Sequence, residues 1–229
     1  MFLITGSGRS GTSAVAQLLH EAGLSVGRDL IEPDEHNAEG YFEERMVIMI
    51  NDAILKAAGV GEWFTTATRE QIREAAAEYI DYMREQVKVA TPAWKDPRFS
   101  WTLEPWLDVL PEPPRIIVCL RSPAEVVAST LRYYAQAGEE AENAVKHVWR
   151  TQYERLLEII GEYGLDATCV EYAELHADPQ AAVQPLAQFV GRVLDAQTVR
   201  HDLRHHAVPV TDDLAELYER VRKLGVAVP

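Results

Sequence analysis

The residues with the clearest chemical potential lie in a glycine-rich loop near the N-terminus. A short apolar strand expected at 2–5 runs into Gly6-Ser-Gly-Arg-Ser-Gly-Thr-Ser13, and an apolar helix is expected at 11–22. A strand that turns directly into a helix leaves the first N–H groups of the helix unpaired and directed at one place, where a phosphate or sulfate group binds well. Further donors surround that place on Arg9, Ser10, Thr12 and Ser13. The loop therefore predicts binding of a phosphorylated ligand.

The same loop fits the spacing of a dinucleotide-binding fingerprint. Its three glycines have the G-x-G-x-x-G arrangement, which alone is a weak signal. That fingerprint requires a second strand that ends in an acidic residue about 20 residues later. The corresponding segment, 24–33, contains glycine, arginine and proline and makes a poor buried strand, although Asp29 and Glu32 are available as the acid. An NAD-dependent oxidoreductase of the Rossmann type is thereby disfavoured, and it stays open as an alternative.

A nucleoside triphosphatase loop is the next alternative. Gly6 and Gly11 are separated by four residues, as in such loops, which continue with a lysine for the β- and γ-phosphates and then with Ser or Thr. Thr12 occupies the position of that lysine. No clear Mg²⁺-binding acid follows a strand either. A kinase-like phosphotransferase is therefore less favoured.

A second segment carries a strand followed directly by a helix. The apolar run 115–120 follows two prolines, as expected of a buried parallel strand, and leads into Arg121-Ser-Pro-Ala-Glu-Val-Val-Ala-Ser129. Ser122 and Glu125 have the spacing of a capping box, and Pro123 is expected at the first helical position. Arg121 is thus expected at the carboxyl end of a strand, where α/β sheets bind ligands, and Ser129 two turns into the following helix.

Both segments resemble nucleotide-binding motifs of sulfotransferases. Arg9-Ser-Gly-Thr-Ser13 is similar to the 5′-phosphosulfate loop of that family, Lys-Ser-Gly-Thr-Thr, with Arg in place of Lys, which keeps the charge but not the geometry. Arg121 and Ser129 resemble the family's 3′-phosphate-binding element. A 3′-phosphate distinguishes 3′-phosphoadenosine 5′-phosphosulfate (PAPS) from ATP and NAD. The resemblance implies PAPS as sulfuryl donor and 3′-phosphoadenosine 5′-phosphate (PAP) as product.

Three further segments agree with this resemblance. Trp94-Lys-Asp-Pro-Arg98 lies where these enzymes carry a strand that ends in a catalytic lysine. The segment 167–179 resembles the family's "Tyr-Glu-Asp-Leu…Asp-Pro" stretch, with Ala173 in place of the usual Glu, so Tyr172 is expected against adenine. Gly40-Tyr-Phe-Glu43 is similar to the "Asn-Pro-x-Gly-Tyr-Trp-Glu" of bacterial members. Together these motifs imply the following PAPS-binding residues: Gly8, Arg9, Ser10, Gly11, Thr12, Ser13, Arg121, Ser129 and Tyr172.

The bulk properties restrict the class of protein. The chain has 229 residues and is expected to form a single sulfotransferase-like domain over 1–229. Its net charge of −14 argues against nucleic acid and anionic membranes as partners. No run of 18 apolar residues and no secretory signal are found, and Cys119 and Cys169 fall in expected buried strands as free thiols. We therefore expect a cytoplasmic protein whose anionic ligand binds at a local group of basic residues, drawn from Arg9, Lys95, Arg98, Arg121 and Arg132.

The order of elements predicts the fold class. Strands expected at 2–5, 92–95, 115–120 and 167–171 alternate with helices near 11–22, 42–58, 68–89, 100–109, 123–136 and 139–162, and the rest is expected to be helical. Thr68 and Gln71 have the spacing of a capping box at the start of the third helix. Such alternation predicts an α/β, three-layer P-loop-like fold with a mostly parallel central sheet and helices on both faces.

Sulfuryl transfer requires a base for the acceptor, positive charge on the transferring group and in-line alignment. The predicted catalytic residues are Glu43, Lys95 and Arg9, with Arg9 and Lys95 as the cations. Glu43 is preferred as base because it is expected in the first turn of a helix with an inward apolar face. The other candidate bases are Asp34, Glu35, His36, Glu39 and Asp96. No metal is required, and the histidines at 201, 205 and 206 are predicted to be solvated or to contact phosphate rather than bind metal.

The sequence thus predicts a sulfotransferase that moves the sulfuryl group of PAPS to a hydroxyl or amine of a small-molecule or glycan acceptor. A protein that binds a nucleotide without catalysis stays open as a further alternative. Acceptor specificity is expected to reside in loops such as 24–42 and 59–67. Six aromatic residues are candidates for the lining of an acceptor pocket, although aromatics at such spacings more often belong to the core, and none is assigned: Trp63, Phe64, Tyr79, Tyr82, Tyr133 and Tyr134.

Overall fold

The computed structural model describes residues 1–35, 37, 39–61, 64–89, 91–199, 210 and 214–225. Within this part of the chain, a sheet of four parallel strands has the order β2-β1-β3-β4. The strands are β1 (Phe2–Gly6), β2 (Ala93–Lys95), β3 (Arg115–Leu120) and β4 (Ala167–Glu171). Their register aligns Ile4 with Lys95 and Leu120 with Glu171, so the carboxyl ends of all four strands meet at one edge.

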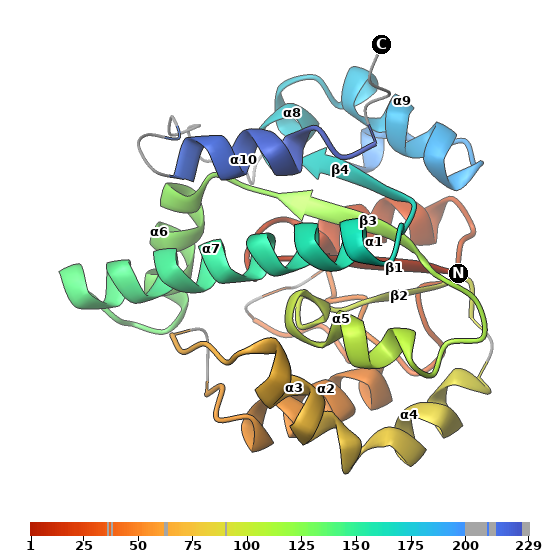
Figure 1. Ribbon diagram of the computed structural model, residues 1–229. Helices are drawn as coiled ribbons and strands as arrows, with labels where there is room; N and C mark the ends of the chain where they lie inside the picture. The colour runs from red at the N-terminus through yellow and green to blue at the C-terminus, as the bar shows by residue number, and fades with distance from the viewer. Residues whose placement is uncertain are drawn as a thin grey trace.

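Helices connect and cover these strands (Figure 1). The described helices are α1 (Thr12–Glu21), α2 (Arg45–Ala57), α3 (Arg69–Ala77), α4 (Ile80–Val87), α5 (Phe99–Leu107), α6 (Pro123–Tyr133), α7 (Glu139–Glu162), α8 (Tyr172–Ala177), α9 (Pro179–Val190), the short 3₁₀ helix η1 (Ala196–Thr198) and α10 (Ala215–Arg222). The predicted α/β fold with a parallel sheet between helical layers is confirmed.

Alternation along β3 divides the core into two halves. Ile116, Val118 and Leu120 pack with apolar residues of α2, α5, α7 and α10. Ile117 and Cys119 point to the opposite face and pack with α1 and α9. Successive side chains of a strand alternate between faces, and helices cover both faces, which explains why β3 reads as an uninterrupted apolar run. In Figure 1, α5 and α7 lie in front of the strands and α1 lies behind them.

Two local expectations need correction. The helix expected at 68–89 is divided into α3 and α4, because Tyr79 leaves helical geometry (φ −109°, ψ 4°) and its N–H bonds to Ala76, three residues back. At its start, Thr68 and Gln71 form the predicted capping box. Ser122 and Glu125 do not form one: Ser122 makes no side-chain cap, although Pro123 begins α6 as predicted.

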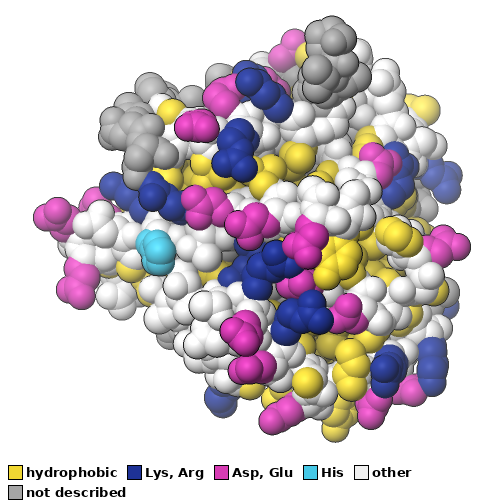
Figure 2. Space-filling view, in the orientation of Figure 1, with side chains coloured by type: hydrophobic (Ala, Val, Ile, Leu, Met, Phe, Trp, Pro, Cys, Tyr) yellow, Lys and Arg dark blue, Asp and Glu magenta, His cyan; other side chains and the backbone are white. Residues whose placement is uncertain are grey.

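The structure also bears on the predictions about surface charge, the cysteines and membrane-spanning segments. Basic and acidic side chains are interspersed on the face that Figure 2 shows, so the acidic excess of the chain does not form a patch of one sign there. Both cysteines are free thiols, and burial raises the pKa of Cys119 to about 12. Within the described residues, no helix has the length and apolar character needed to cross a membrane.

Candidate active site

The glycine-rich loop joins β1 to α1 at the carboxyl edge of the sheet. Gly11 precedes α1 in a left-handed conformation (φ 85°), and no side chain caps the helix. A Cβ atom at Gly11 would lie 2.5 Å from Cδ2 of Tyr172, so a side chain there would collide with the tyrosine ring. The missing side chain thus lets Tyr172 lie directly against the loop, and no side chain of the described residues accepts from the first N–H groups of α1.

A tyrosine of α7 supports this loop from below. The hydroxyl of Tyr153 donates to the carbonyl oxygen of Cys119 (2.7 Å), accepts from the N–H of Ser7 (3.2 Å) and lies 3.1 Å from Oγ of Ser10. Tyr153 is fully buried, and burial raises its pKa. The Ser10 hydroxyl therefore lies beneath the loop and holds it to β3 through Tyr153.

The sequence predicts a helix over 139–162, but Tyr153 was not singled out in it, and this role was missed. The available signal was its hydroxyl, because a buried tyrosine normally finds a hydrogen-bond partner for that group. The partners of the hydroxyl, Cys119 and Ser7, lie 34 and 146 residues away in the chain. Helix periodicity carries no information about contacts at that separation.

Arg9 and Ser129 meet on one side of the loop. Nε of Arg9 donates to Oγ of Ser129 (3.2 Å), and the guanidinium lies 5.0 Å from the ring centre of Tyr133. Arg9 is exposed and has a left-handed backbone (φ 66°), which is uncommon for a residue with a side chain. The loop thus presents a cation to solvent beside the start of α1.

Arg121 lies next to this pair, beneath the loop backbone. Its Nη1 atom donates to the carbonyl oxygen of Arg9 (3.1 Å), and its guanidinium lies 4.2 Å from the ring centre of Tyr172. Its Nη2 atom is 3.7 Å from Oε1 of Glu125, the carboxylate that sequence analysis had expected to cap α6. Burial raises the pKa of Glu125, and the charge of Arg121 opposes this rise. The loop, Arg121, Ser129 and Tyr172, which are widely separated in sequence, are therefore neighbours.

A second cluster lies at the end of β2, with Lys95 at its centre. Nζ of Lys95 lies 2.5 Å from Oε1 of Glu43 and donates to Oγ of Ser13 (3.2 Å). Lys95 and Glu43 are both buried, and a buried charge needs such a partner. Ser13 belongs to the first turn of α1, and Thr12 is buried beside it. The contact between Lys95 and Ser13 joins the second cluster to the glycine-rich loop.

The position of Glu43 differs from the sequence prediction. The helix α2 begins at Arg45, so Glu43 lies before its first turn rather than within it. The chain turns at Gly40 (φ 100°) and Phe42 (φ 57°), and the N–H of Ile31 donates to the carbonyl oxygen of Glu43 (3.0 Å). Glu43 is therefore directed inward by an extended segment, not by the face of an amphipathic helix.

Asp96 and Arg98 extend the cluster. The Asp96 carboxylate accepts from Nδ2 of Asn51 (2.8 Å) and from the backbone N–H and Nη1 of Arg98 (2.9 Å each). Arg98 also pairs with Asp52 and places Nη1 3.5 Å from Oε2 of Glu43. Burial lowers the pKa of Arg98, but the three carboxylates outweigh burial and raise it above its usual value. Asp96 is fully buried and both of its oxygens are engaged, so it orients Arg98.

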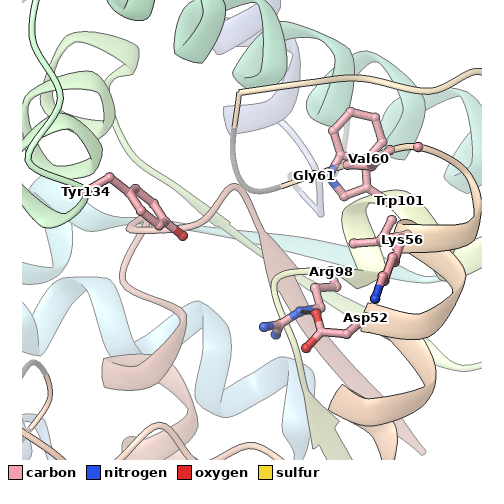
Figure 3. A pocket seen from close by; sticks show the side chains of 9 residues that line it. Asp52, Lys56, Val60, Gly61, Arg98, Trp101 and Tyr134 are labelled. Atoms are coloured by element: carbon pink, nitrogen blue, oxygen red, sulfur yellow. Dashed lines mark hydrogen bonds and ion pairs between the residues drawn. The ribbon is translucent and has the colours of Figure 1, made fainter.

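A cavity of about 500 Å³ adjoins Arg98 (Figure 3). It lies between α2, the loop after α2, the start of α5 and the end of α6. Its lining residues are Asp52, Leu55, Lys56, Gly59, Val60, Gly61, Arg98, Trp101 and Tyr134. Part of the loop expected to hold the acceptor, 59–61, therefore lines a cavity next to the Lys95 cluster.

Three of the remaining candidate bases are acidic residues that the structure describes, and other candidates lie outside the described residues. Asp34 is exposed, and its Oδ1 atom accepts from the hydroxyl of Tyr41 (2.8 Å) and the N–H of Asn37 (3.0 Å). Glu35 is exposed and Glu39 half-buried. The predictions for His36, Trp63 and the histidines at 201, 205 and 206 lie outside the described residues. Among the residues that are described, no three His, Cys, Asp or Glu side chains are grouped to hold a metal ion.

The sequence of the chain matches a known protein family over most of its length. The model of the sulfotransferase family matches residues 2–196, which include the glycine-rich loop, Lys95, Arg121 and Tyr172. The chain belongs to the sulfotransferase family. A transferase activity follows from this membership, and the predicted family resemblance is confirmed.

Solved structures support the same fold at low sequence identity. The sulfotransferase domain of the olefin synthase of Synechococcus PCC 7002 has 16% identity and a TM-score of 0.52, over 100% of this chain and 88% of that domain. The sulfotransferase domain from the curacin biosynthetic pathway has 15% identity and a TM-score of 0.51, over 100% of this chain and 92% of that domain. A search of curated protein sequences finds no match.

Proposed function

We propose that this sulfotransferase transfers the sulfuryl group of PAPS to a hydroxyl or amine of a small-molecule acceptor. The observation that carries the proposal is the pairing of two clusters across the start of α1. Arg9, Arg121, Ser129 and Tyr172 lie on one side, and the Lys95–Glu43 pair lies on the other, 3.2 Å from Ser13. A cationic anion site and a base are thereby next to each other.

The residues present fit PAPS in the chemistry of their donors. The uncapped start of α1, from Gly11 to Ser13, offers backbone N–H groups for the 5′-phosphosulfate, and Gly8 and Arg9 complete that loop. Arg121 and Ser129 are the proposed ligands of the 3′-phosphate, because a guanidinium forms strong charged hydrogen bonds with phosphate and a hydroxyl donates one more. Tyr172 is the proposed contact of the adenine. Thr12 and Ser10 complete the loop by holding its conformation.

The proposed catalytic roles follow from the second cluster. When bound, PAPS supplies a sulfuryl group whose bond to the phosphate oxygen breaks as the acceptor oxygen or nitrogen bonds to sulfur. Glu43 accepts the proton that the acceptor loses. Lys95 and Arg9 stabilise the negative charge that develops on the leaving phosphate, from the two sides of the start of α1. Lys95 also holds the Glu43 carboxylate in place through the 2.5 Å contact.

We also propose that the chain forms a single domain and that the protein is cytoplasmic. Beyond the matched residues, α10 packs against α7, β3 and β4, and the N–H of Cys169 donates to the carbonyl oxygen of Leu224 (3.2 Å). These contacts support a single domain over 1–229. Free thiols at Cys119 and Cys169 fit a reducing compartment, which supports a cytoplasmic location.

Ligand-dependent thermal stability tests the proposal without knowledge of the acceptor. A ligand present at 100 times its dissociation constant stabilises the folded protein by about 2.7 kcal/mol. We expect PAP to raise the melting temperature clearly and ATP and NAD at the same concentration to raise it little. Stabilisation by ATP or NAD equal to that by PAP would contradict a PAPS-dependent enzyme and favour a phosphotransferase or an oxidoreductase.

A further inference from the structure

The cavity beside Arg98 has the size and position of a binding site for a small molecule. Its volume of about 500 Å³ lies within the range of about 300–1,000 Å³ that is typical of ligand pockets. Figure 3 shows Asp52, Lys56, Val60, Gly61 and Trp101 gathered near Arg98, with Tyr134 across from them. Three separate parts of the fold therefore enclose it.

Arg98 connects this cavity to the proposed base. The side chain lines the cavity and places Nη1 3.5 Å from Oε2 of Glu43. Tyr134, on the opposite side of the cavity, connects it to the glycine-rich loop. Its ring packs against that of Tyr133 (4.9 Å between ring centres), and the guanidinium of Arg9 lies 5.0 Å from the ring centre of Tyr133. A molecule in the cavity therefore lies beside Arg98 of the second cluster and beside Tyr134, which contacts Arg9 through Tyr133.

The described lining of the cavity is largely apolar. Leu55, Val60 and Trp101 supply hydrocarbon and ring surface, and two glycines supply backbone. Among the described lining residues, none is Asn, Gln, Ser, Thr or His, and Tyr134 supplies the one hydroxyl. A sugar carries many hydroxyl groups, and the lining offers them few partners, because Asp52 and Arg98 are already paired with each other. The lining therefore favours an apolar molecule over a glycan.

The charged residues of the lining are not equivalent. The Asp52 carboxylate is bound to Arg98, which is also paired with Asp96 and Glu43. Lys56 is exposed and has no ion pair within the described residues. It follows Asp52 by four residues on α2, about 6 Å further along the helix axis and away from Glu43. The end of the cavity remote from the base is thus positively charged.

We propose that this cavity is the acceptor site, and that the acceptor is a small hydroxylated molecule with an apolar body and an acidic group. Its hydroxyl lies beside Arg98 and Glu43, its body contacts Trp101 and Val60, and its acidic group lies near Lys56. This inference rests on the proposed function, since it places the acceptor against the proposed base. It adds the chemical class of the acceptor and the residues that select it.

Binding of three phenols of similar size to the protein saturated with PAP tests this inference. The probes are 3-(4-hydroxyphenyl)propanoate, which is anionic, 4-propylphenol, which is neutral, and tyramine, which is cationic. Titration calorimetry gives the three affinities. We expect the anion to bind more tightly than the cation, and the neutral phenol to lie between them. Equal binding of all three, or preference for tyramine, would overturn the assignment of the acidic group.

Two variants connect the binding to the cavity. Lys56→Gln should weaken binding of the anionic probe by about three- to fivefold, the scale of an exposed ion pair, and should leave the neutral probe unaffected. Gly61→Trp should weaken all three probes by about fivefold or more, because a bulky group then occupies the cavity. Among the described residues, no atom lies within 4 Å of a Cβ at Gly61, so the variant is expected to fold. Lys146→Gln, on the exposed side of α7, is the matched control.

The outcomes separate the two proposals. If PAP stabilises wild type and Gly61→Trp equally, and Gly61→Trp binds the probes as wild type does, the cavity is not the acceptor site, whereas PAPS dependence stands. If PAP binds and none of the three phenols does, the proposed acceptor class is wrong. If PAP does not bind wild type, the proposed function itself fails.

Discussion

Nζ of Lys95 lies 2.5 Å from Oε1 of Glu43, and both side chains are buried at the start of α1. The lysine is the last residue of β2, and the glutamate, 52 residues earlier in the chain, precedes α2. Each charge compensates the other, so a change to one residue also affects the environment of its partner. The activity and stability of variants at these positions are therefore best measured together.

Glu43→Gln should remove the proposed base while preserving the size of the side chain. We expect kcat to fall by about 10²- to 10⁴-fold, because general-base catalysis contributes on that scale. PAP affinity should change little. Glu44→Gln is the matched control, since Glu44 is also buried but accepts from the N–H groups of Arg28 and Asp29. Near-normal turnover of Glu43→Gln, with loss of turnover in Asp96→Asn, would show that the base is not Glu43.

Lys95→Met should leave Glu43 without its closest cation. Breaking a buried ion pair costs about 3–5 kcal/mol of stability, whereas removal of both charges often costs less. We therefore expect the free energy of unfolding to fall less for the Glu43→Gln, Lys95→Met double variant than for the sum of the single variants. Urea denaturation measures this coupling. Strictly additive effects would show that the two side chains do not interact in solution.

Arg9→Asn should test the proposed charge stabilisation without disturbing the loop. Asparagine tolerates the left-handed backbone that Arg9 adopts, so the fold should be retained. We expect kcat to fall on the order of 10²-fold, the effect of removing one group that stabilises developing charge. Steady-state kinetics with PAPS measures it, with Arg192→Gln, at an exposed position after α9, as control. An Arg9→Asn enzyme with wild-type kcat would exclude Arg9 from catalysis.

Tyr153→Phe should weaken PAP binding through the loop, although Tyr153 is not a proposed PAP ligand. Its hydroxyl contacts Ser7, Ser10 and Cys119, and loss of a buried hydroxyl leaves such partners unsatisfied at a cost of about 1–3 kcal/mol. We expect weaker PAP affinity in calorimetry as well as a lower melting temperature. Tyr163→Phe, which removes a bond to Glu104, is the control. If both variants lose stability but keep wild-type PAP affinity, Tyr153 serves stability alone.

Local sequence patterns predicted the parts of the site that depend on one element. The loop between β1 and α1, the positions of Arg121 and Ser129 around a strand end, and Lys95 at the end of β2 all follow from strand and helix boundaries. The parallel order of the strands then brings these boundaries to one edge. This is why most candidate residues lie together in the fold.

Contacts between distant elements were beyond the sequence patterns. The turn at Gly40 and Phe42 places Glu43 before α2, and helix periodicity has no means to show this. The support of the loop by Tyr153 depends on the packing of α7 against the sheet. The cavity beside Arg98 depends on three elements at once. Such features require the relative positions of elements, which the spacing of residues within one element does not contain.

The most direct measurement compares the affinities of PAP and adenosine 5′-monophosphate, which differ in the 3′-phosphate alone. Charged hydrogen bonds contribute about 1.5–3 kcal/mol, so we expect calorimetry to show PAP binding about 10- to 150-fold more tightly to the wild-type protein. Ser129→Ala and Arg121→Ala should reduce this ratio, with the larger effect at Arg121. Equal affinities of the two nucleotides for the wild-type protein would contradict recognition of a 3′-phosphate, and with it the PAPS-dependent transfer proposed for this chain.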